Sequence, residues 1–280
     1  MDAGFILNIY IMSRKIIFIH GMFQNPVSWT PWVTYFSAQG FDCHAPAWPD
    51  HDGEPRVLRA SPPETLGDLT LEEVIEKLEA DVILAGGDDP DVSKRPIVVG
   101  HSVGGLIAQI FVSRGLASLA VAICPVAPNK MMTLDWPFFK NVAAIANPFK
   151  GDKPFEHTAE TFHESFCNTL TKEDAALAFK LTATPDSRNV LRGCLGSAGE
   201  IDITLKHAPL LFISAKEDKI IPYELVEKNA SAYTDVSSMV TYKEFPDRSH
   251  YICVEPGSEE VVDHVHQWIK DQQSAVPLFV

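Results

Sequence analysis

The chain of 280 residues is long enough to bury one large core, because a domain of about 300 residues hides roughly 75% of its unfolded surface. Hydrophobic residues (46%) and charged residues (21%) occur at ordinary globular frequencies, which disfavours disorder and coiled coil. The formal net charge of −14 repels polyanions, so we expect no nucleic-acid partner.

The first residues, 4–12, are apolar but lack a basic start and a small-residue cleavage site. They are too few to cross a bilayer, so we expect no stable membrane insertion. We interpret them as an extension in front of the first strand, with Met12 as an alternative start to Met1. The five cysteines are an odd number without metal-ligand spacing, which predicts reduced thiols in a cytoplasmic protein. The oligomeric state stays open.

Six apolar runs of strand length alternate with helical patterns along the chain. Runs that are apolar throughout are typical of strands buried on both faces of a parallel sheet. They cover residues 15–20, 41–45, 96–99, 119–124, 210–214 and 240–245. Amphipathic helices are predicted over residues 71–84 and 259–270. This alternation predicts an α/β fold with a mostly parallel sheet flanked by helices.

The alternation stops between residues 126 and 205, where prolines break helix-like segments and residues 171–181 form a clear helix candidate. We interpret this stretch as a helical cap inserted in a core formed by residues 1–125 and 206–280. Its aromatic residues have two open interpretations, a small core of the cap or an apolar roof over a substrate pocket. The candidate pocket residues are Trp136, Phe138, Phe139 and Phe166.

The strongest motif is the sequence GHSVGG at residues 100–105, which follows an apolar run and precedes a helical pattern. A nucleophile elbow requires this context, with a serine on a sharp turn from strand to helix and small neighbours that let the backbones approach. The alternative is a glycine-rich turn without chemistry. We identify Ser102 as the candidate nucleophile, and we expect His101 to pack behind it.

A serine hydroxyl needs a base, and the base needs a carboxylate that orients it. Glu217 and Asp218 follow one predicted strand, and His250 follows the next. Both loops lie at carboxyl ends of strands, where open α/β sheets bind ligands. Among the ten histidines, His250 has both the strand-end position and the place in the chain expected of the base.

These motifs resemble the α/β-hydrolase superfamily, in the serine-nucleophile branch of esterases and lipases with a helical cap. The resemblance covers nearly the whole chain apart from the first dozen residues and the cap. It implies that Asp218 is the acid, because the family commonly places the acid four residues before a proline, here Pro222. The family histidine usually follows a glycine, whereas this chain has Ser249.

The resemblance also implies an oxyanion hole, which is usually the largest single catalytic contribution. One backbone amide would come from Met22, which follows the His-Gly pair at residues 20–21. The other would come from Val103, the residue after the nucleophile.

The motifs together indicate a serine hydrolase that cleaves a carboxylic ester, lactone or thioester of a small apolar molecule through an acyl-enzyme on Ser102. The same triad supports lyase chemistry, hydrolysis of C–C bonds and acyl transfer, among which the fold does not choose. A ligand receptor on a hydrolase scaffold is the alternative from another class. The sequence shows no metal-ligand spacing, phosphate-binding loop or dinucleotide fingerprint, so no cofactor is implied.

Overall fold

The computed structural model describes residues 14–131, 142–143 and 145–275. Within them the strands form one six-stranded sheet in the order β2-β1-β3-β4-β5-β6, and every neighbouring pair is parallel. The strands are β1 (Lys15–Ile19), β2 (Asp42–His44), β3 (Ile97–His101), β4 (Leu119–Ile123), β5 (Leu210–Ala215) and β6 (Val240–Phe245). Each of the six predicted runs overlaps one of these strands, and β3 and β5 extend one or two residues beyond their predicted runs. The predicted fold class is confirmed.

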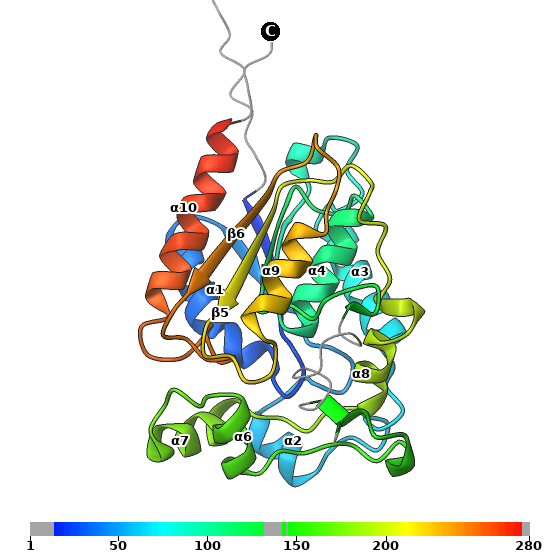
Figure 1. Ribbon diagram of the computed structural model, residues 1–280, viewed down its shortest axis with the longest axis vertical. Helices are drawn as coiled ribbons and strands as arrows, with labels where there is room; N and C mark the ends of the chain where they lie inside the picture. The colour runs from blue at the N-terminus through cyan, green and yellow to red at the C-terminus, as the bar shows by residue number, and fades with distance from the viewer. Residues whose placement is uncertain (1–13, 132–141, 144, 276–280) are drawn as a thin grey trace, which may run out of the picture.

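Helices connect the strands and cover both faces of the sheet (Figure 1). In the described chain the α-helices are α1 (Thr30–Ala38), α2 (Pro55–Ala60), α3 (Leu71–Leu84), α4 (Val103–Ser113), α6 (Ala159–Ser165), α7 (Lys172–Thr182), α8 (Arg188–Cys194), α9 (Tyr223–Ser231) and α10 (Glu259–Ala275). Short 3-10 helices are η1 (Pro26–Trp29), η2 (Val92–Lys94), η4 (Pro148–Lys150) and η5 (Ser197–Gly199). Helix α3 begins at a capping box, in which Thr70 and Glu73 each bind the other's backbone N–H.

Consecutive strand residues pack into different apolar clusters because side chains alternate across a strand. Phe18 packs with Trp32 of α1 and Val265 of α10 on one face of the sheet. Ile17 belongs to the cluster on the other face, which includes residues of α3, α4 and α9. The residues of both clusters are buried, so the central strands are buried on both faces. This explains why these strands are apolar throughout.

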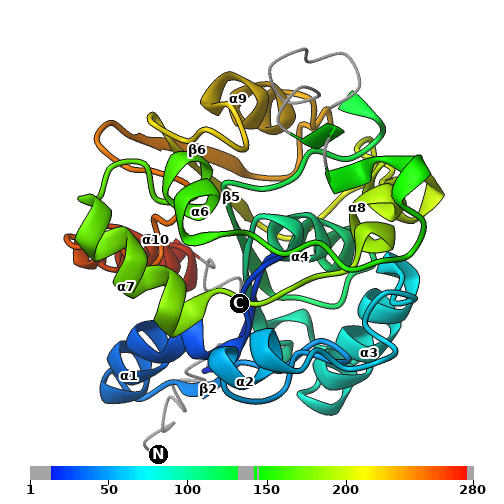
Figure 2. The same ribbon diagram turned by 90° about the horizontal axis from the view of Figure 1, so that it is seen from below.

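The segment between β4 and β5 contains α6, α7 and α8, and we call residues 126–205 the cap. In Figure 1, α6 and α7 lie beyond the arrowheads of β5 and β6, at the carboxyl end of the sheet. Figure 2 shows α6 and α7 on one side of this end and α8 on the other. Phe162 and Phe166 of the cap belong to the same apolar cluster as Leu106 of α4. The cap therefore packs directly on the edge of the sheet where ligands are expected.

None of the described helices is long and apolar enough to cross a membrane. All five cysteines carry free thiols.

Candidate active site

Ser102 occupies a strained turn between β3 and α4. Its φ of 56° and ψ of −118° lie in a region that non-glycine residues rarely adopt, at a cost of about 1–3 kcal/mol. A Cβ on Gly104 would lie 2.2 Å from the Ile19 oxygen, and a Cβ on Gly21 would lie 2.7 Å from the Ser102 Cβ. Only glycine at these positions lets the end of β1 approach the elbow, so the local sequence favours a serine held at the sheet edge.

His250 and Asp218 form a buried pair at the ends of β6 and β5. The distance between His250 Nδ1 and Asp218 Oδ2 is 2.7 Å. Because a carboxylate only accepts, Nδ1 carries a proton, and in the neutral imidazole this leaves the lone pair on Nε2. The other carboxylate oxygen accepts hydrogen bonds from the amides of Ile220 (2.7 Å) and Ile221 (2.8 Å). Glu217 is exposed instead, so the geometry favours Asp218 as the orienting acid.

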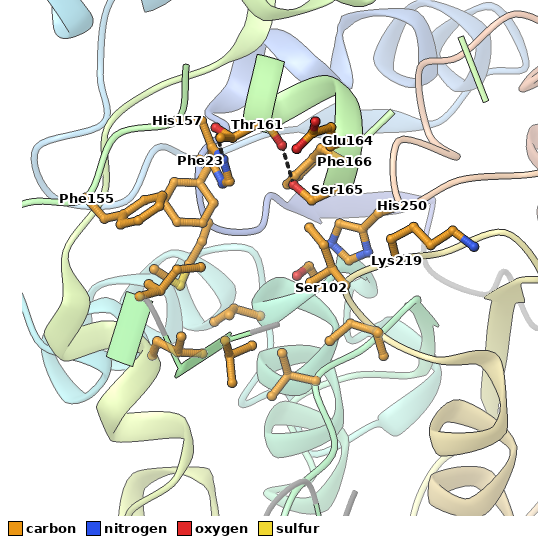
Figure 3. Close-up of a pocket in the computed structure, with 18 residues that line it drawn as sticks. Phe23, Ser102, Phe155, His157, Thr161, Glu164, Ser165, Phe166, Lys219 and His250 are labelled. Atoms are coloured by element: carbon orange, nitrogen blue, oxygen red, sulfur yellow. Dashed lines mark hydrogen bonds between the residues drawn. The ribbon is translucent and has the colours of Figure 1, made fainter. Parts of the chain in front are cut away.

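Ser102 and His250 line the same cavity, and Figure 3 shows the serine side chain beside the imidazole ring. In the described structure, His250 Nε2 is buried and has no hydrogen-bond partner. Catalytic hydrogen bonds are often loose in unliganded enzymes and tighten when the substrate binds. The three residues of the predicted triad thus come together at the carboxyl edge of the sheet.

The cavity has a volume of about 320 Å³. Its apolar wall includes Met22, Ile145 and Leu191, while α6 contributes Thr161 and Glu164. This mixture is typical of ligand sites, in which a few polar groups orient a molecule held by apolar contacts.

Phe166 is the predicted pocket residue that the described structure includes. It is buried and lines the cavity, and its ring lies 4.8 Å from that of His250 at an interplanar angle of 89°. Trp136, Phe138 and Phe139 lie outside the described residues.

The two predicted oxyanion donors face the same region. Val103 is the first residue of α4, where a backbone N–H has no acceptor within the helix. Met22 lies in the turn after β1, and both residues line the cavity.

Glu255 supports the histidine loop and is a residue that sequence reasoning missed. Its carboxylate accepts hydrogen bonds from the Ser249 amide (3.2 Å), the Ser249 hydroxyl (2.8 Å) and the hydroxyl of Thr169 in the cap (2.7 Å). Burial raises the pKa of Glu255 above its usual value. Ser249, which stands where the family usually has a glycine, therefore has Glu255 as a structural partner. No local sequence motif predicts this contact.

Two further groups lie against the triad. His101 is buried and its Nε2 donates to the His250 carbonyl oxygen (2.8 Å), while burial holds its pKa well below 6.5. Cys124 offers a sulfur atom within 4.8 Å of ligand atoms of Asp218 and His250, a grouping that could hold a metal ion. The carboxylate and imidazole are already joined by a hydrogen bond, which favours the triad as the role of this cluster. Burial, followed by the nearby Asp218 charge, raises the pKa of Cys124, so its thiol is protonated at neutral pH.

The architecture and these motifs agree with comparisons to known proteins. A model of the Alpha/beta hydrolase family matches residues 16–264. No curated protein matches the chain at a significant level.

Solved structures share the fold at low sequence identity. A monoacylglycerol lipase from Paleococcus ferrophilus has a TM-score of 0.66 and 17% identity, covering 92% of this chain and 94% of its own. Tomato methylketone synthase I complexed with 2-tridecanone has a TM-score of 0.66 and 14% identity, with coverages of 93% and 99%. A methylesterase from Arabidopsis has a TM-score of 0.63 and 14% identity, with coverages of 91% and 98%. The family match spans most of the chain, and the chain belongs to the α/β-hydrolase family.

Proposed function

We propose that this protein is a serine hydrolase that cleaves the carboxylic ester, lactone or thioester of a small apolar molecule. One observation carries the proposal. The buried Asp218 binds His250 Nδ1 at 2.7 Å and leaves Nε2 as a base, in a cavity that also contains the strained Ser102.

In the proposed mechanism, His250 Nε2 takes the proton of Ser102 as the hydroxyl oxygen attacks the acyl carbon. The amides of Met22 and Val103 bind the oxyanion of the tetrahedral intermediate. His250 then protonates the leaving group, and the acyl-enzyme remains on Ser102. Nε2 then deprotonates a water molecule that attacks the acyl-enzyme, and His250 returns this proton to the Ser102 oxygen as the carboxylic acid leaves.

The cavity suggests how a substrate would lie. In Figure 3, Phe23 and Phe155 lie to one side of Ser102, and Lys219 lies to the other side, beyond His250. The leaving group must approach His250 because it receives the proton from this residue. We therefore place the leaving group toward Lys219 and the apolar acyl group toward Phe23 and Phe155.

The names of the structural neighbours fit an apolar ester substrate. They include a lipase and a methylesterase, and the tomato protein is complexed with 2-tridecanone, a ketone with a long apolar chain. The same triad remains compatible with a lyase, a C–C bond hydrolase, an acyltransferase or a receptor that binds without turnover.

Turnover of 4-nitrophenyl esters of increasing acyl length tests the proposal. We expect Ser102→Ala to lose about 10⁴- to 10⁶-fold in kcat while the fold persists, because only oxyanion and binding effects remain. Wild-type protein that binds these esters without releasing nitrophenol would favour the receptor. Turnover that is equal in wild type and in Ser102→Ala would contradict the assigned nucleophile.

A further inference from the structure

A second histidine–carboxylate pair is buried beside the site and takes no part in the mechanism above. His51, after β2, places Nε2 3.3 Å from Oδ2 of Asp186, which directly precedes the N-cap of α8 in the cap. The two side chains are 1% and 0% exposed. A buried charge without a partner is strongly unfavourable, so each of these two groups needs the other if it is charged.

The hydrogen bonds of His51 indicate that it carries a positive charge. Its Nδ1 lies 2.8 Å from the Pro49 carbonyl oxygen, which only accepts, so Nδ1 is protonated. A bare Nε2 lone pair would be repelled by the Asp186 carboxylate, and this contact is an ion pair without the alignment of a hydrogen bond. Burial is the largest single influence and opposes the charged form, but Asp186, the Pro49 carbonyl and Asp50 together outweigh it and raise the pKa of His51.

The neighbouring His20 is neutral and does not compete for the carboxylate. Its ring lies 5.5 Å from that of His51. His20 Nδ1 donates to the Gly21 oxygen (2.9 Å), and its Nε2 accepts from the Trp48 amide (3.4 Å). Burial lowers the pKa of His20 well below 6.5.

The ion pair is attached to the turn formed by Met22 and Phe23, which carries the proposed oxyanion donor and which we call the oxyanion turn. Asp186 Oδ2 accepts a hydrogen bond from the Phe23 amide at 2.8 Å. The Thr184 amide donates to the Phe23 oxygen at 3.0 Å, so one short cap segment binds both polar groups of Phe23. Phe23 has a φ of 63°, a left-handed conformation that is unfavourable for an aromatic residue and must be held by its surroundings.

We propose that Asp186 is a positioning residue of the oxyanion hole, holding Phe23 in its strained conformation so that the Met22 amide points at the developing oxyanion, while His51 neutralises Asp186. This inference rests on the proposed function, in which Met22 binds the oxyanion. Neutralisation matters because an unpaired carboxylate close to the hole would repel the negative charge of the transition state. The pair therefore acts on kcat more than on substrate binding.

The test uses Asp186→Ala, His51→Gln and the matched control Asn189→Ala. Asn189 also joins the cap to the core, through the Gly67 oxygen (3.0 Å), and within the described residues its side-chain hydrogen bonds go to groups outside the turn of Met22 and Phe23. For each folded variant, kcat and KM for a 4-nitrophenyl ester are measured with the inhibition constant of a trifluoromethyl ketone. This inhibitor forms a tetrahedral adduct with the serine and places an oxyanion in the hole.

We expect Asp186→Ala to lower kcat about 100-fold with KM changed less than about threefold, because misplacing one catalytic donor costs about this much. Ketone affinity should fall in parallel with kcat. His51→Gln, which keeps the bond between Asp186 and Phe23, should lower kcat about 10-fold through loss of the compensating charge. Asn189→Ala should leave both quantities within about twofold.

Hydrogen exchange of the amides at residues 22–25 provides a measure that does not depend on activity. Exchange at Phe23 should accelerate in Asp186→Ala and stay slow in Asn189→Ala. An unchanged kcat in folded Asp186→Ala overturns the inference, and so does an unchanged kcat in His51→Gln if Asp186→Ala does not fold. A wild-type protein without turnover refutes the proposed function instead, and the exchange rates still decide whether Asp186 holds the turn.

Discussion

The core and the cap contribute to the site in different ways. Loops at the ends of core strands supply Ser102, Asp218 and His250, the groups proposed to react. The cap supplies Phe166 against the imidazole and Asp186 against the oxyanion turn, neither of which is placed to exchange a proton with substrate. We infer from this comparison that the core determines which reaction is possible, and that the cap determines the geometry of the site and the substrates that fit it.

The largest expected effect concerns the core. Asp218→Asn should lower kcat by about 10⁴-fold on every ester, because the amide no longer holds His250 in the tautomer that leaves Nε2 bare. The adjacent Glu217→Gln is the matched control, and kcat should change less than about twofold since this side chain is exposed. Steady-state kinetics on both variants provide the measurement. A sensitive Glu217 and a tolerant Asp218 would show that the acid is assigned to the wrong residue.

A smaller and more selective effect is expected in the cap. Phe166 is 1% exposed and stacks on Phe162 with ring centroids 4.7 Å apart. Phe166→Ala should lower the free energy of unfolding by about 3–5 kcal/mol and should also change the ranking of short and bulky esters, because the ring lines the cavity. Phe149→Ala, which removes a cap aromatic ring that is 95% exposed, should change neither quantity.

Urea unfolding and an ester panel, measured together, check this prediction. A loss of stability with an unchanged ester ranking would mean that Phe166 only holds the cap together. The assignment of Phe166 to substrate selection would then be wrong.

The smallest effect is a dependence of stability on pH through the junction of core and cap. The pKa of His51 is raised in the folded protein above its ordinary value of 6.5. The stabilisation is therefore complete below about pH 6.5 and is lost as the pH rises through the folded pKa. We expect the free energy of unfolding to fall as the pH rises above about 6.5, and His51→Gln to flatten this slope. An identical slope in wild type and variant would place the titrating group elsewhere.

The same contrast explains what could be predicted from sequence. Local sequence patterns predict the strands and the elbow, such as the apolar run 97–99 followed by GHSVGG. The fold and the candidate triad could therefore be predicted. The contact between Phe23 and Asp186 joins residues 163 positions apart and has no local signature. The same holds for Thr169 and Glu255, which are 86 positions apart. Such contacts depend on how the cap docks, which single-residue patterns do not encode.

The most direct test of Ser102 as the nucleophile is covalent labelling of its side chain. A fluorophosphonate probe reacts with a serine that is activated by a neighbouring base, and mass spectrometry locates the adduct. We predict a single adduct on the peptide containing Ser102 in wild type and none in Ser102→Ala, with both proteins folded. An adduct on another residue, or equal labelling of the two proteins, would contradict the assignment of Ser102 as the nucleophile.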